Sequence, residues 1–328
     1  MHNVVFLLKG KPEADVIASC EEACVRLEKQ GIRASVRIGE PARLPVPEKD
    51  GPMPETHGLL KTDTLILADD PALIPVLSDA GYAVIALQHA GNASESFSGA
   101  KYIFAEPEEV DLDSYRKAWQ RLSGLPWDIL ETKRLKLRET TVEDVDSLYG
   151  IYAMPGMTTY MEGLFPDPED EKRYMRDYIE NVYGLMGVGV WSIIEKESGA
   201  LIGRAGFSIR NGFESIELGF FIGTTWQGKG YAQEACDAVL RYGRRYLEID
   251  TVQALVKEGN TVSEHILEKL GFSLVKTVDV EEDIYGKHYP EADSSGVHRP
   301  PVSPARYGRY HLYLLNQIHD RTGGDDAD

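Results

Sequence analysis

The 328-residue sequence predicts an α/β protein built from two domains. Short apolar runs, typical of buried strands, alternate with segments whose apolar residues recur at helical spacing. A Pro- and Gly-containing segment, residues 124–132, interrupts this alternation and is predicted to be a linker. We therefore place one domain in residues 1–123 and another in 133–316, followed by an acidic tail, 317–328, which is expected to be disordered.

The composition excludes several classes of protein. A formal net charge of −18 and a pI of about 4.9 oppose binding to nucleic acid and fit the attraction of cationic substrates. Three cysteines make no disulfide framework, and no apolar run approaches the roughly 20 residues of a membrane span. We expect a cytoplasmic protein with no nucleic-acid or membrane partner, and the sequence leaves a homodimer open.

The first domain begins with a βαβ unit. Residues 3–8 and 32–38 are predicted strands, and a helix over 12–30 carries an apolar stripe between them. Cys20 and Cys24 have the spacing of a metal or redox pair but lie within that stripe, with no His or third Cys nearby. Core packing is therefore the better interpretation of both thiols.

The rest of the first domain repeats this alternation. Five prolines between Pro41 and Pro54 predict a long loop. The elements expected after it are a strand at 64–68, a helix at 71–80, a strand at 82–87, a short strand at 102–104 and a helix at 112–122. Together they predict a small, three-layer, Rossmann-like domain.

Residues 68–86 resemble the late acidic motif, and the helix and strand after it, of haloacid dehalogenase-type phosphatases. The nucleophilic Asp-x-Asp motif of that family is missing, because residues 3–10 end in Leu-Leu-Lys-Gly. Asp69 and Asp70 are therefore predicted to be a helix cap and a first-turn acid rather than Mg²⁺ ligands. His89 is expected to be a loop residue. The sequence predicts no metal site.

The second domain is predicted to hold a mixed sheet. Its expected elements are a strand at 134–139, helices at 141–153 and 168–183, a hairpin at 188–210, a strand at 215–223, a helix at 231–247, a strand at 251–256, a helix at 261–270, and strands at 272–280 and 309–315.

Two glycines stand where the strand at 215–223 passes through a short loop into a helix. Gly228 and Gly230 lie at the N-terminus of that helix, where first-turn N–H groups have no intrahelical partner and the helix dipole is positive. A pyrophosphate satisfies both conditions, and glycine lets it approach the backbone closely. The pattern predicts a phosphate cradle.

Residues 133–316 resemble the Gcn5-related N-acetyltransferases (GNAT), and among them the RimJ/RimL-like type. Four motifs carry the resemblance in the family's order: the opening strand 134–139, the central strand 216–222, the loop 227–232 with the pattern Q/R-x-x-G-x-G/A, and Asn260 to Ser263 with 267–272. The resemblance implies a splayed mixed sheet and an acyltransferase of class EC 2.3.1.-, with acetyl-CoA as co-substrate.

The same resemblance implies which residues bind acetyl-CoA. The pantetheine arm is expected to pair with the backbone from Phe220 to Ile222, as an added strand would, and an N–H near Ile222 is expected to stabilise the oxyanion. Asn260 is expected to cap its helix, to contact the cofactor, or both. The full set is Phe220, Phe221, Ile222, Gln227, Gly228, Lys229, Gly230, Tyr231, Ala232, Asn260 and Ser263.

The catalytic residues follow the family less closely. Glu217 is similar in position to the family's general base, although a solvent-facing carboxylate is the alternative, and Glu214 and Glu162 are substitutes. Many members place a tyrosine where this chain has Leu267. Ser263 is left to protonate the thiolate or bind its sulfur, unless it is merely a first-turn serine.

Acceptor selection is assigned to residues 157–165, Trp191 and the loop 285–307. Tyr160 and Glu162 suit a cationic amine, although packing alone also explains this run. The predicted reaction is direct attack by a primary amine, of a protein N-terminus, a lysine or a small molecule, in a ternary complex. The alternative is a catalytically weak, CoA-binding regulatory module whose first domain binds a partner.

Overall fold

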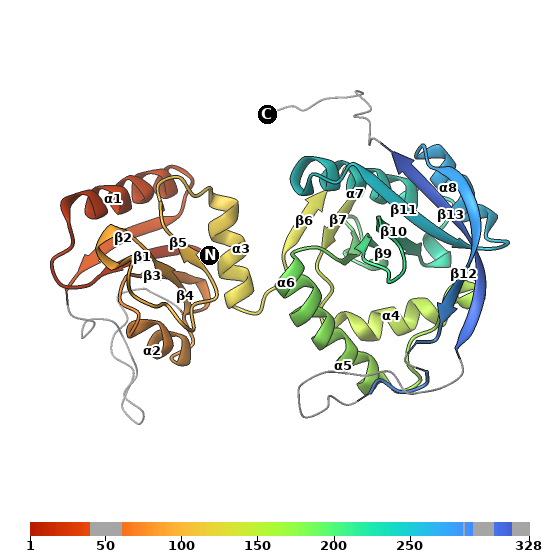
Figure 1. Cartoon of the computed structure of the whole chain (residues 1–328), viewed down its shortest axis with the longest axis horizontal. Coiled ribbons are helices and arrows are strands. Elements are labelled where there is room, and N and C mark those ends of the chain that lie inside the picture. The colour runs from red at the N-terminus through yellow and green to blue at the C-terminus, as the bar shows by residue number, and fades with distance from the viewer. Residues whose placement is uncertain (40–60, 285, 291–304, 317–328) are drawn as a thin grey trace. The chain divides into compact units, whose positions relative to one another are not determined.

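The computed structural model describes the chain as two units. The units are Met1–Trp127 and Asp128–Asp328, and each is described by itself (Figure 1). The described residues are 1–39, 61–284, 286–290 and 305–316. Three sequence predictions fall wholly or largely outside them: the proline-rich loop 41–54, most of the loop 285–307, and the tail 317–328.

The first unit is built on a five-stranded sheet in the order β2-β1-β3-β4-β5, in which every neighbouring pair is parallel. Its elements are β1 (Asn3–Leu8), α1 (Ala14–Lys29), β2 (Arg33–Ile38), β3 (Thr64–Ala68), α2 (Leu73–Asp79), β4 (Ala83–Leu87), β5 (Ile103–Phe104) and α3 (Leu112–Leu122). The predicted alternation of strands and helices is confirmed.

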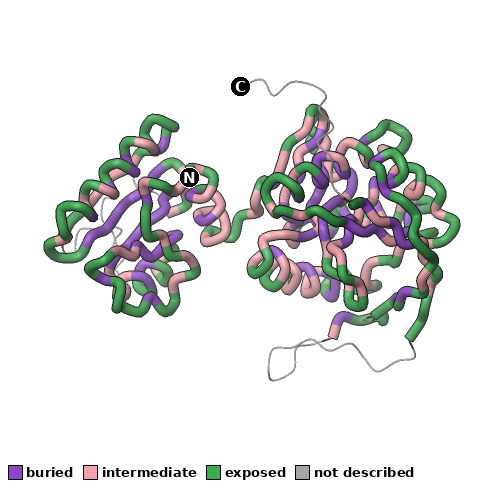
Figure 2. The backbone as a smooth tube through the Cα atoms, turned by 45° about the horizontal axis from the view of Figure 1, so that its top comes forward, coloured by how far each residue is buried: buried purple, intermediate pink, exposed green. Residues whose placement is uncertain are grey.

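Helices cover both faces of this sheet. Side chains at alternate positions of a strand point to opposite faces. In β1, Val4 and Phe6 pack in a core with α1 and α3, while Val5 packs with α2. Figure 2 shows the strands as the buried layer between them. This is the expected three-layer arrangement, and Cys20 and Cys24 lie in its core as packing residues.

The second unit is built on an eight-stranded mixed sheet in the order β12-β13-β11-β10-β9-β8-β7-β6. Its elements are β6 (Asp128–Glu131), β7 (Leu135–Arg138), α4 (Asp144–Tyr152), α5 (Pro168–Tyr178), α6 (Gly184–Met186), β8 (Val190–Glu195), β9 (Leu201–Ser208), β10 (Ile216–Ile222), α7 (Tyr231–Leu247), β11 (Thr251–Lys257), α8 (Thr261–Lys269), β12 (Ser273–Glu282) and β13 (Arg306–Asn316).

The linker prediction differs from the structure at one point. Residues 128–131, placed in the linker 124–132 by the sequence, form the edge strand β6 and pair with β7. Trp127 donates its indole N–H to the Lys117 carbonyl of α3 at 2.7 Å, so it belongs to the first unit. The change between units therefore falls directly after Trp127.

Opposite faces of the second sheet carry different helices. Trp191 of β8 packs edge-on against Tyr242 of α7, with ring centroids 5.5 Å apart. On the other face, Phe221 of β10 packs edge-on against Tyr152 of α4 and joins the cluster that α4 and α5 build. Residues of β10 at odd positions therefore face α4 and α5.

The predicted helix 168–183 contains a π-helical turn. After α5, residues Ile179–Tyr183 form a π-helix, whose extra residue per turn brings Tyr178 and Tyr183 to the same side. Tyr178 accepts from the Val190 N–H at 2.8 Å, and Tyr183 donates to the Val190 carbonyl at 2.6 Å. Gly189 permits this approach, because a Cβ there would lie 2.5 Å from the Tyr183 ring.

Candidate active site

The strands β10 and β11 separate along their length. They pair in parallel at Ile216↔Val252 and Glu217↔Gln253, and no further pairing joins these two fully described strands. The Gly223 N–H donates to the Ile202 carbonyl of β9 at 2.8 Å. Since backbone groups alternate in direction along a strand, the amides of Phe220 and Ile222 point away from β9, into the opening.

One backbone group at this opening already has a side-chain partner. Gln227 Nε2 donates to the Ile222 carbonyl oxygen at 2.7 Å. The Gln227 side chain also reaches Met157, with 3.9 Å between Nε2 and Sδ. The Ile222 carbonyl is thus placed to accept a hydrogen bond from an amide that enters between the strands.

The glycine loop, residues 227–232, leads from this opening into α7. Gly228 and Gly230 have φ values of 73° and 80°, in the left-handed region that favours glycine. Gly230 is the N-cap of α7, a helix of 17 residues, and has no side chain to occupy its first N–H groups. Exposed N–H groups at the positive end of a long helix favour an anionic ligand.

Glu217 lies at the point where the two strands part. The residue is 7% exposed and faces α4 and α5. Its Oε2 lies 2.8 Å from Nε of Arg210, just beyond the end of β9. Burial raises the pKa of Glu217, while the positive charge of Arg210 opposes this shift. The carboxylate is therefore buried and paired, rather than solvent-facing.

A buried amide adjoins Glu217. Gln253 is 2% exposed and is its register partner on β11. The Gln253 amide lies close enough to lower the pKa of Glu217, but its Nε2 makes no hydrogen bond of good geometry within the described part of the chain. A buried donor in this state is uncommon in native proteins.

The first turn of α8 holds the residues of the last predicted motif. Asn260 is the N-cap, and its Oδ1 accepts from the Ser263 N–H at 3.3 Å. Asn260 therefore caps the helix, as one of its two predicted roles required. Leu267, in the position where many relatives carry a tyrosine, is fully buried and packs inward.

The segment 154–162 crosses the open end of the strands. Met154 Sδ lies 3.7 Å from Thr225 Oγ1, beside the glycine loop. Farther along, the Tyr160 ring lies 3.4 Å from the position of a Cβ on Gly259, in the turn after β11. Tyr160 is 40% exposed. The segment therefore touches the ends of both β10 and β11.

Glu162 links this segment to the end of β12. It is an exposed residue, yet its carboxylate is partly desolvated, which raises its pKa. The Asp283 backbone N–H donates to this carboxylate, whereas the charges of Asp283 and Glu282 raise its pKa further. A cationic group would be stabilised at this position.

Glu282 is a buried carboxylate that the sequence reasoning missed. It is 4% exposed, and its Oε1 lies 2.8 Å from Lys257 Nζ and accepts from the Tyr310 hydroxyl at 2.7 Å. These contacts, Lys257 foremost, lower its pKa. The predicted strand ended at residue 280, but β12 continues to Glu282, and the alternation from buried Val280 would have placed Glu282 inside.

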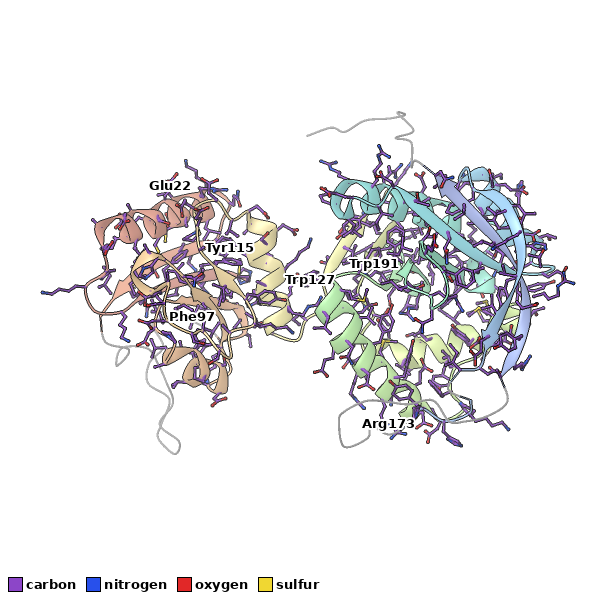
Figure 3. The ribbon with its side chains drawn as sticks, in the orientation of Figure 1. Glu22, Phe97, Tyr115, Trp127, Arg173 and Trp191 are labelled. Carbon is purple, nitrogen blue, oxygen red and sulfur yellow. The ribbon has the colours of Figure 1, made fainter. Side chains whose placement is uncertain are left out.

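Two other residues that the sequence assigned to the site, Trp191 and Glu214, differ in burial. Trp191, assigned to the acceptor site, is fully buried on the face that α7 covers, between Phe207 and Tyr242 (Figure 3). Its position gives it a packing role, and we do not carry it into the proposed site. Glu214, a substitute for the base, is exposed.

The acidic pair in the first unit is engaged by the chain itself. Asp69 is 5% exposed; its Oδ1 accepts from the Lys9 N–H at 2.7 Å, and its Oδ2 lies 3.4 Å from His89 Nε2. Asp70 Oδ1 accepts from the Ala72 N–H at 3.1 Å and pairs with Lys9 Nζ at 3.2 Å. Lys9 thus contacts both carboxylates, with its backbone N–H at Asp69 and its ammonium group at Asp70.

The residues that the structure describes contain neither a metal-binding cluster nor a membrane-spanning helix. Within 1–39, 61–284, 286–290 and 305–316, no group of three or more His, Cys, Asp or Glu side chains is arranged to hold a metal ion. No helix in the same ranges is long and apolar enough to cross a membrane.

Comparison with known proteins identifies the class to which this fold and site belong. A family model described as an acetyltransferase (GNAT) domain matches residues 134–273. An uncharacterized N-acetyltransferase of Bacillus licheniformis, p20, is 34% identical over 151 residues, which cover 44% of this chain and 82% of the relative. The ribosomal protein uS5 alanine N-acetyltransferase of Escherichia coli is 37% identical over 103 residues, covering 31% and 47%.

Solved acetyltransferases also match this chain, at lower sequence identity. The acetyltransferase of Agrobacterium tumefaciens is 23% identical with a TM-score of 0.43, covering 57% of this chain and 94% of its own. RimL, a ribosomal L7/L12 α-N-protein acetyltransferase solved with coenzyme A, is 13% identical with a TM-score of 0.44, covering 58% and 99%.

Both sequence relatives reported above are named as N-acetyltransferases, a kind of acyltransferase. This chain belongs to the GNAT family and is an N-acetyltransferase. The family uses acetyl-CoA, as the resemblance of the four motifs implied.

Proposed function

We propose that the second unit transfers the acetyl group of acetyl-CoA to a primary amine by direct attack in a ternary complex. The separation of β10 and β11 beyond Glu217↔Gln253 carries this proposal. It leaves backbone groups directed into an opening that has a buried carboxylate at its closed end and the glycine loop at its far end. An extended thioester substrate fits between these two features.

Three parts of the chain are proposed to hold acetyl-CoA. The N–H groups of the glycine loop and the first turn of α7 bind the pyrophosphate. The backbone amides of Phe220 and Ile222 pair with the pantetheine amides in the manner of an added strand. The Gln227 side chain supports this assignment, because its bond to the Ile222 carbonyl oxygen indicates that this group faces the opening and can accept from an amide there. Asn260 adds a polar side chain at the turn before α8.

Glu217 is proposed to take the proton of the acceptor amine, through a water molecule. A lysine-like amine has a pKa of about 10.4 and is largely protonated at neutral pH, so it needs a base before it can attack. The raised pKa of the buried Glu217 carboxylate suits this role. Arg210 Nε holds the carboxylate from one side at 2.8 Å, and the buried Gln253 amide lies close to it.

The amine nitrogen then attacks the thioester carbonyl carbon, a C–N bond forms, and the C–S bond breaks. Backbone N–H groups of β10 near Ile222 stabilise the oxyanion, a type of interaction that contributes about 3 kcal/mol. The sulfur leaves as a thiolate of CoA and takes a proton, while the nitrogen of the new amide loses its second proton to water. Ser263, in the first turn of α8, is the proposed donor, although a thiol pKa of about 8.5 makes water sufficient.

The acceptor amine is proposed to enter beneath the segment 154–162. Tyr160 and Glu162 lie there, and the charges of Asp283, Glu282 and Arg210 act on the Glu162 carboxylate. A protein N-terminus, a lysine and a small amine all present the required cation. The Escherichia coli relative is named for acting on the alanine of a ribosomal protein, which makes peptide N-termini the first acceptors to test.

The proposal is tested by acetyl transfer to a panel of peptides and small amines, followed by mass spectrometry. Glu217→Gln is expected to lower kcat by about 10²- to 10⁴-fold without weakening CoA binding. Glu214→Gln is the matched control, because Glu214 is exposed, lies close in sequence and should leave the rate unchanged. Equal rates for Glu217→Gln and wild type would remove Glu217 from the mechanism.

A second candidate is a CoA-binding regulatory module, with the first unit as its partner-binding domain. The Glu217–Arg210 ion pair favours it, since a paired carboxylate is a weaker base than a free one. CoA binding by a wild-type chain that transfers no acetyl group to any acceptor would support this function over catalysis. Turnover that depends on Glu217 would exclude it.

A further inference from the structure

Arg134 lies directly before β7, and its side chain is hydrogen-bonded to the glycine loop and the first turn of α7. Its Nε donates to Glu234 Oε2 at 2.6 Å, and its Nη1 donates to the Lys229 carbonyl at 2.9 Å. The guanidinium carbon lies 4.4 Å from the centre of the Tyr231 ring. The Arg134 guanidinium therefore contacts three residues of the loop and the first turn of α7: Lys229, Tyr231 and Glu234.

The carboxylate of Glu234 fixes this arrangement. Besides the Arg134 side chain, Glu234 Oε1 accepts from the Arg134 backbone N–H at 3.0 Å and from Thr132 Oγ1 at 2.6 Å. Although burial alone would raise the pKa of Glu234, these hydrogen bonds lower it. Glu234 also lies in the first turn of α7, where the helix dipole favours a negative charge.

The centre of the glycine loop has little side-chain restraint of its own. Gly228 and Gly230 lack side chains and sit on either side of Lys229, with left-handed φ values that glycine adopts without preference over others. The Arg134 bond to the Lys229 carbonyl supplies the restraint that the loop lacks. With Lys229 held, the neighbouring N–H groups are fixed in the direction in which an anion must bind.

We propose that Arg134 is a positioning residue for acetyl-CoA, which acts by holding the Lys229 carbonyl and the first turn of α7 in their pyrophosphate-binding conformation. The inference rests on the proposed use of the glycine loop for the donor. It assigns Arg134 no contact with the reacting atoms, so its loss weakens donor binding and leaves the chemical step intact. We call Arg134, Thr132 and Glu234 together the clamp.

The full-length chain is tested as wild type, Arg134→Gln, Arg134→Lys and Thr132→Val. Removal of the charge-assisted bonds in Arg134→Gln is expected to raise KM for acetyl-CoA at least about tenfold, with kcat within twofold. Arg134→Lys restores the charge but not the forked geometry and is expected to fall in between. Thr132→Val leaves Arg134 in place and is expected to have a smaller effect in the same direction.

Arg241→Gln is the matched control. Arg241 forms an exposed i,i+4 pair with Asp237 on the same helix, at 2.6 Å, away from the glycine loop. Its KM is expected to equal that of the wild type. An Arg134→Gln variant that loses thermal stability but keeps its KM would overturn the inference, as would a fall in kcat at constant KM.

Direct calorimetry of CoA binding separates this inference from the proposed function. If wild type binds CoA but transfers no acetyl group, the proposed function fails while the clamp is still measured as the ratio of CoA dissociation constants. A ratio of about ten or more between Arg134→Gln and wild type then supports the clamp. A ratio near one contradicts it, whatever the enzyme does with acetyl-CoA.

Discussion

The carboxylate of Glu217 and the guanidinium of Arg210 form an ion pair at 2.8 Å, at the point where β10 and β11 part. Arg210 is about one-third exposed, whereas Glu217 is buried. Water therefore reaches one side of the pair and the sheet covers the other. Burial and Arg210 have opposite effects on the pKa of Glu217, the proposed base. Burial raises this pKa, and Arg210 lowers it.

Removing Arg210 should move the pH profile. Glu217 takes a proton only as the carboxylate, so activity falls as the pH drops through its pKa. Arg210→Gln removes the charge that opposes the effect of burial, so the pKa rises further and the acidic limb of kcat/KM moves to higher pH. The measurement is kcat/KM for a peptide acceptor across the pH range.

Arg210→Lys is the control, because it keeps the positive charge beside Glu217. Its acidic limb is expected to stay nearer that of wild type than that of Arg210→Gln. A limb that does not move in Arg210→Gln, or moves to lower pH, would show that another group sets the profile.

Gly228→Ala tests the backbone of the glycine loop. A Cβ at Gly228 meets no atom within 4 Å, so its cost comes from the φ of 73° and not from a clash. An L-residue in that region costs about 1–2 kcal/mol, and the loop relieves this strain by changing shape. We expect lower thermal stability together with a higher KM for acetyl-CoA.

Gly150→Ala is the matched substitution. Gly150 is exposed in α4, its Cβ would also lie in open space, and its φ is not positive. Alanine is favoured over glycine within a helix by about 0.5–1 kcal/mol, so this variant should gain stability and keep its KM. If both variants lose stability alike, strain at Gly228 is not the cause.

Trp191 is expected to be a stability residue without influence on the acceptor. It is fully buried against Tyr242 and Phe207. Trp191→Ala should lower the free energy of unfolding by about 3–5 kcal/mol. Trp191→Phe should cost less, partly because it also removes an indole N–H that is buried without a partner among the described residues.

The KM for the acceptor, measured in folded Trp191→Phe, tests whether Trp191 affects acceptor binding. Denaturant unfolding of the same variant measures its stability. We expect an unchanged KM. A large change in acceptor KM without a change in stability would return Trp191 to the acceptor site.

Local patterns explain why the fold was largely predictable. The apolar runs of β1, β3 and β4 are buried on both faces, as parallel strands between helix layers must be, and the helical stripes beside them fix the layer order. The strand β6 was missed within the predicted linker, and the end of β12 was placed two residues too early, because charged residues end each strand in the sequence. Asp128 and Glu282 look like loop residues until their pairing partners are known.

The site was predictable where the backbone provides the chemistry. Gly228 and Gly230 reveal a helix N-terminus through conformational requirements that the sequence expresses directly. Side-chain partners are different, because they depend on contacts across the sheet. Neither the pairing of Arg210 with Glu217 nor the burial of Trp191 on the α7 face follows from residue spacing, since both depend on which face each strand presents.

The first unit is expected to show no Mg²⁺-dependent phosphatase activity. The carboxylates of Asp69 and Asp70 accept hydrogen bonds from the N–H groups of Lys9 and Ala72, respectively. Lys9 Nζ supplies a positive charge at 3.2 Å from Asp70. A metal ion would have to compete with that ammonium, and the chain has no nucleophilic carboxylate after β1 to accept a phosphoryl group.

Stability measurements separate a structural role for Asp69 from a catalytic one. Asp69→Ala leaves the Lys9 N–H without its acceptor and should cost about 1–3 kcal/mol, whereas Asp70→Ala removes the acceptor of the more exposed Ala72 N–H and should cost about 1 kcal/mol. Both are read by denaturant unfolding, with and without Mg²⁺, alongside hydrolysis of p-nitrophenyl phosphate. If Mg²⁺ stabilises the wild type but not Asp69→Ala, the ion binds at this pair. Mg²⁺-dependent hydrolysis by the wild type that is lost in Asp69→Ala would likewise contradict the purely structural role.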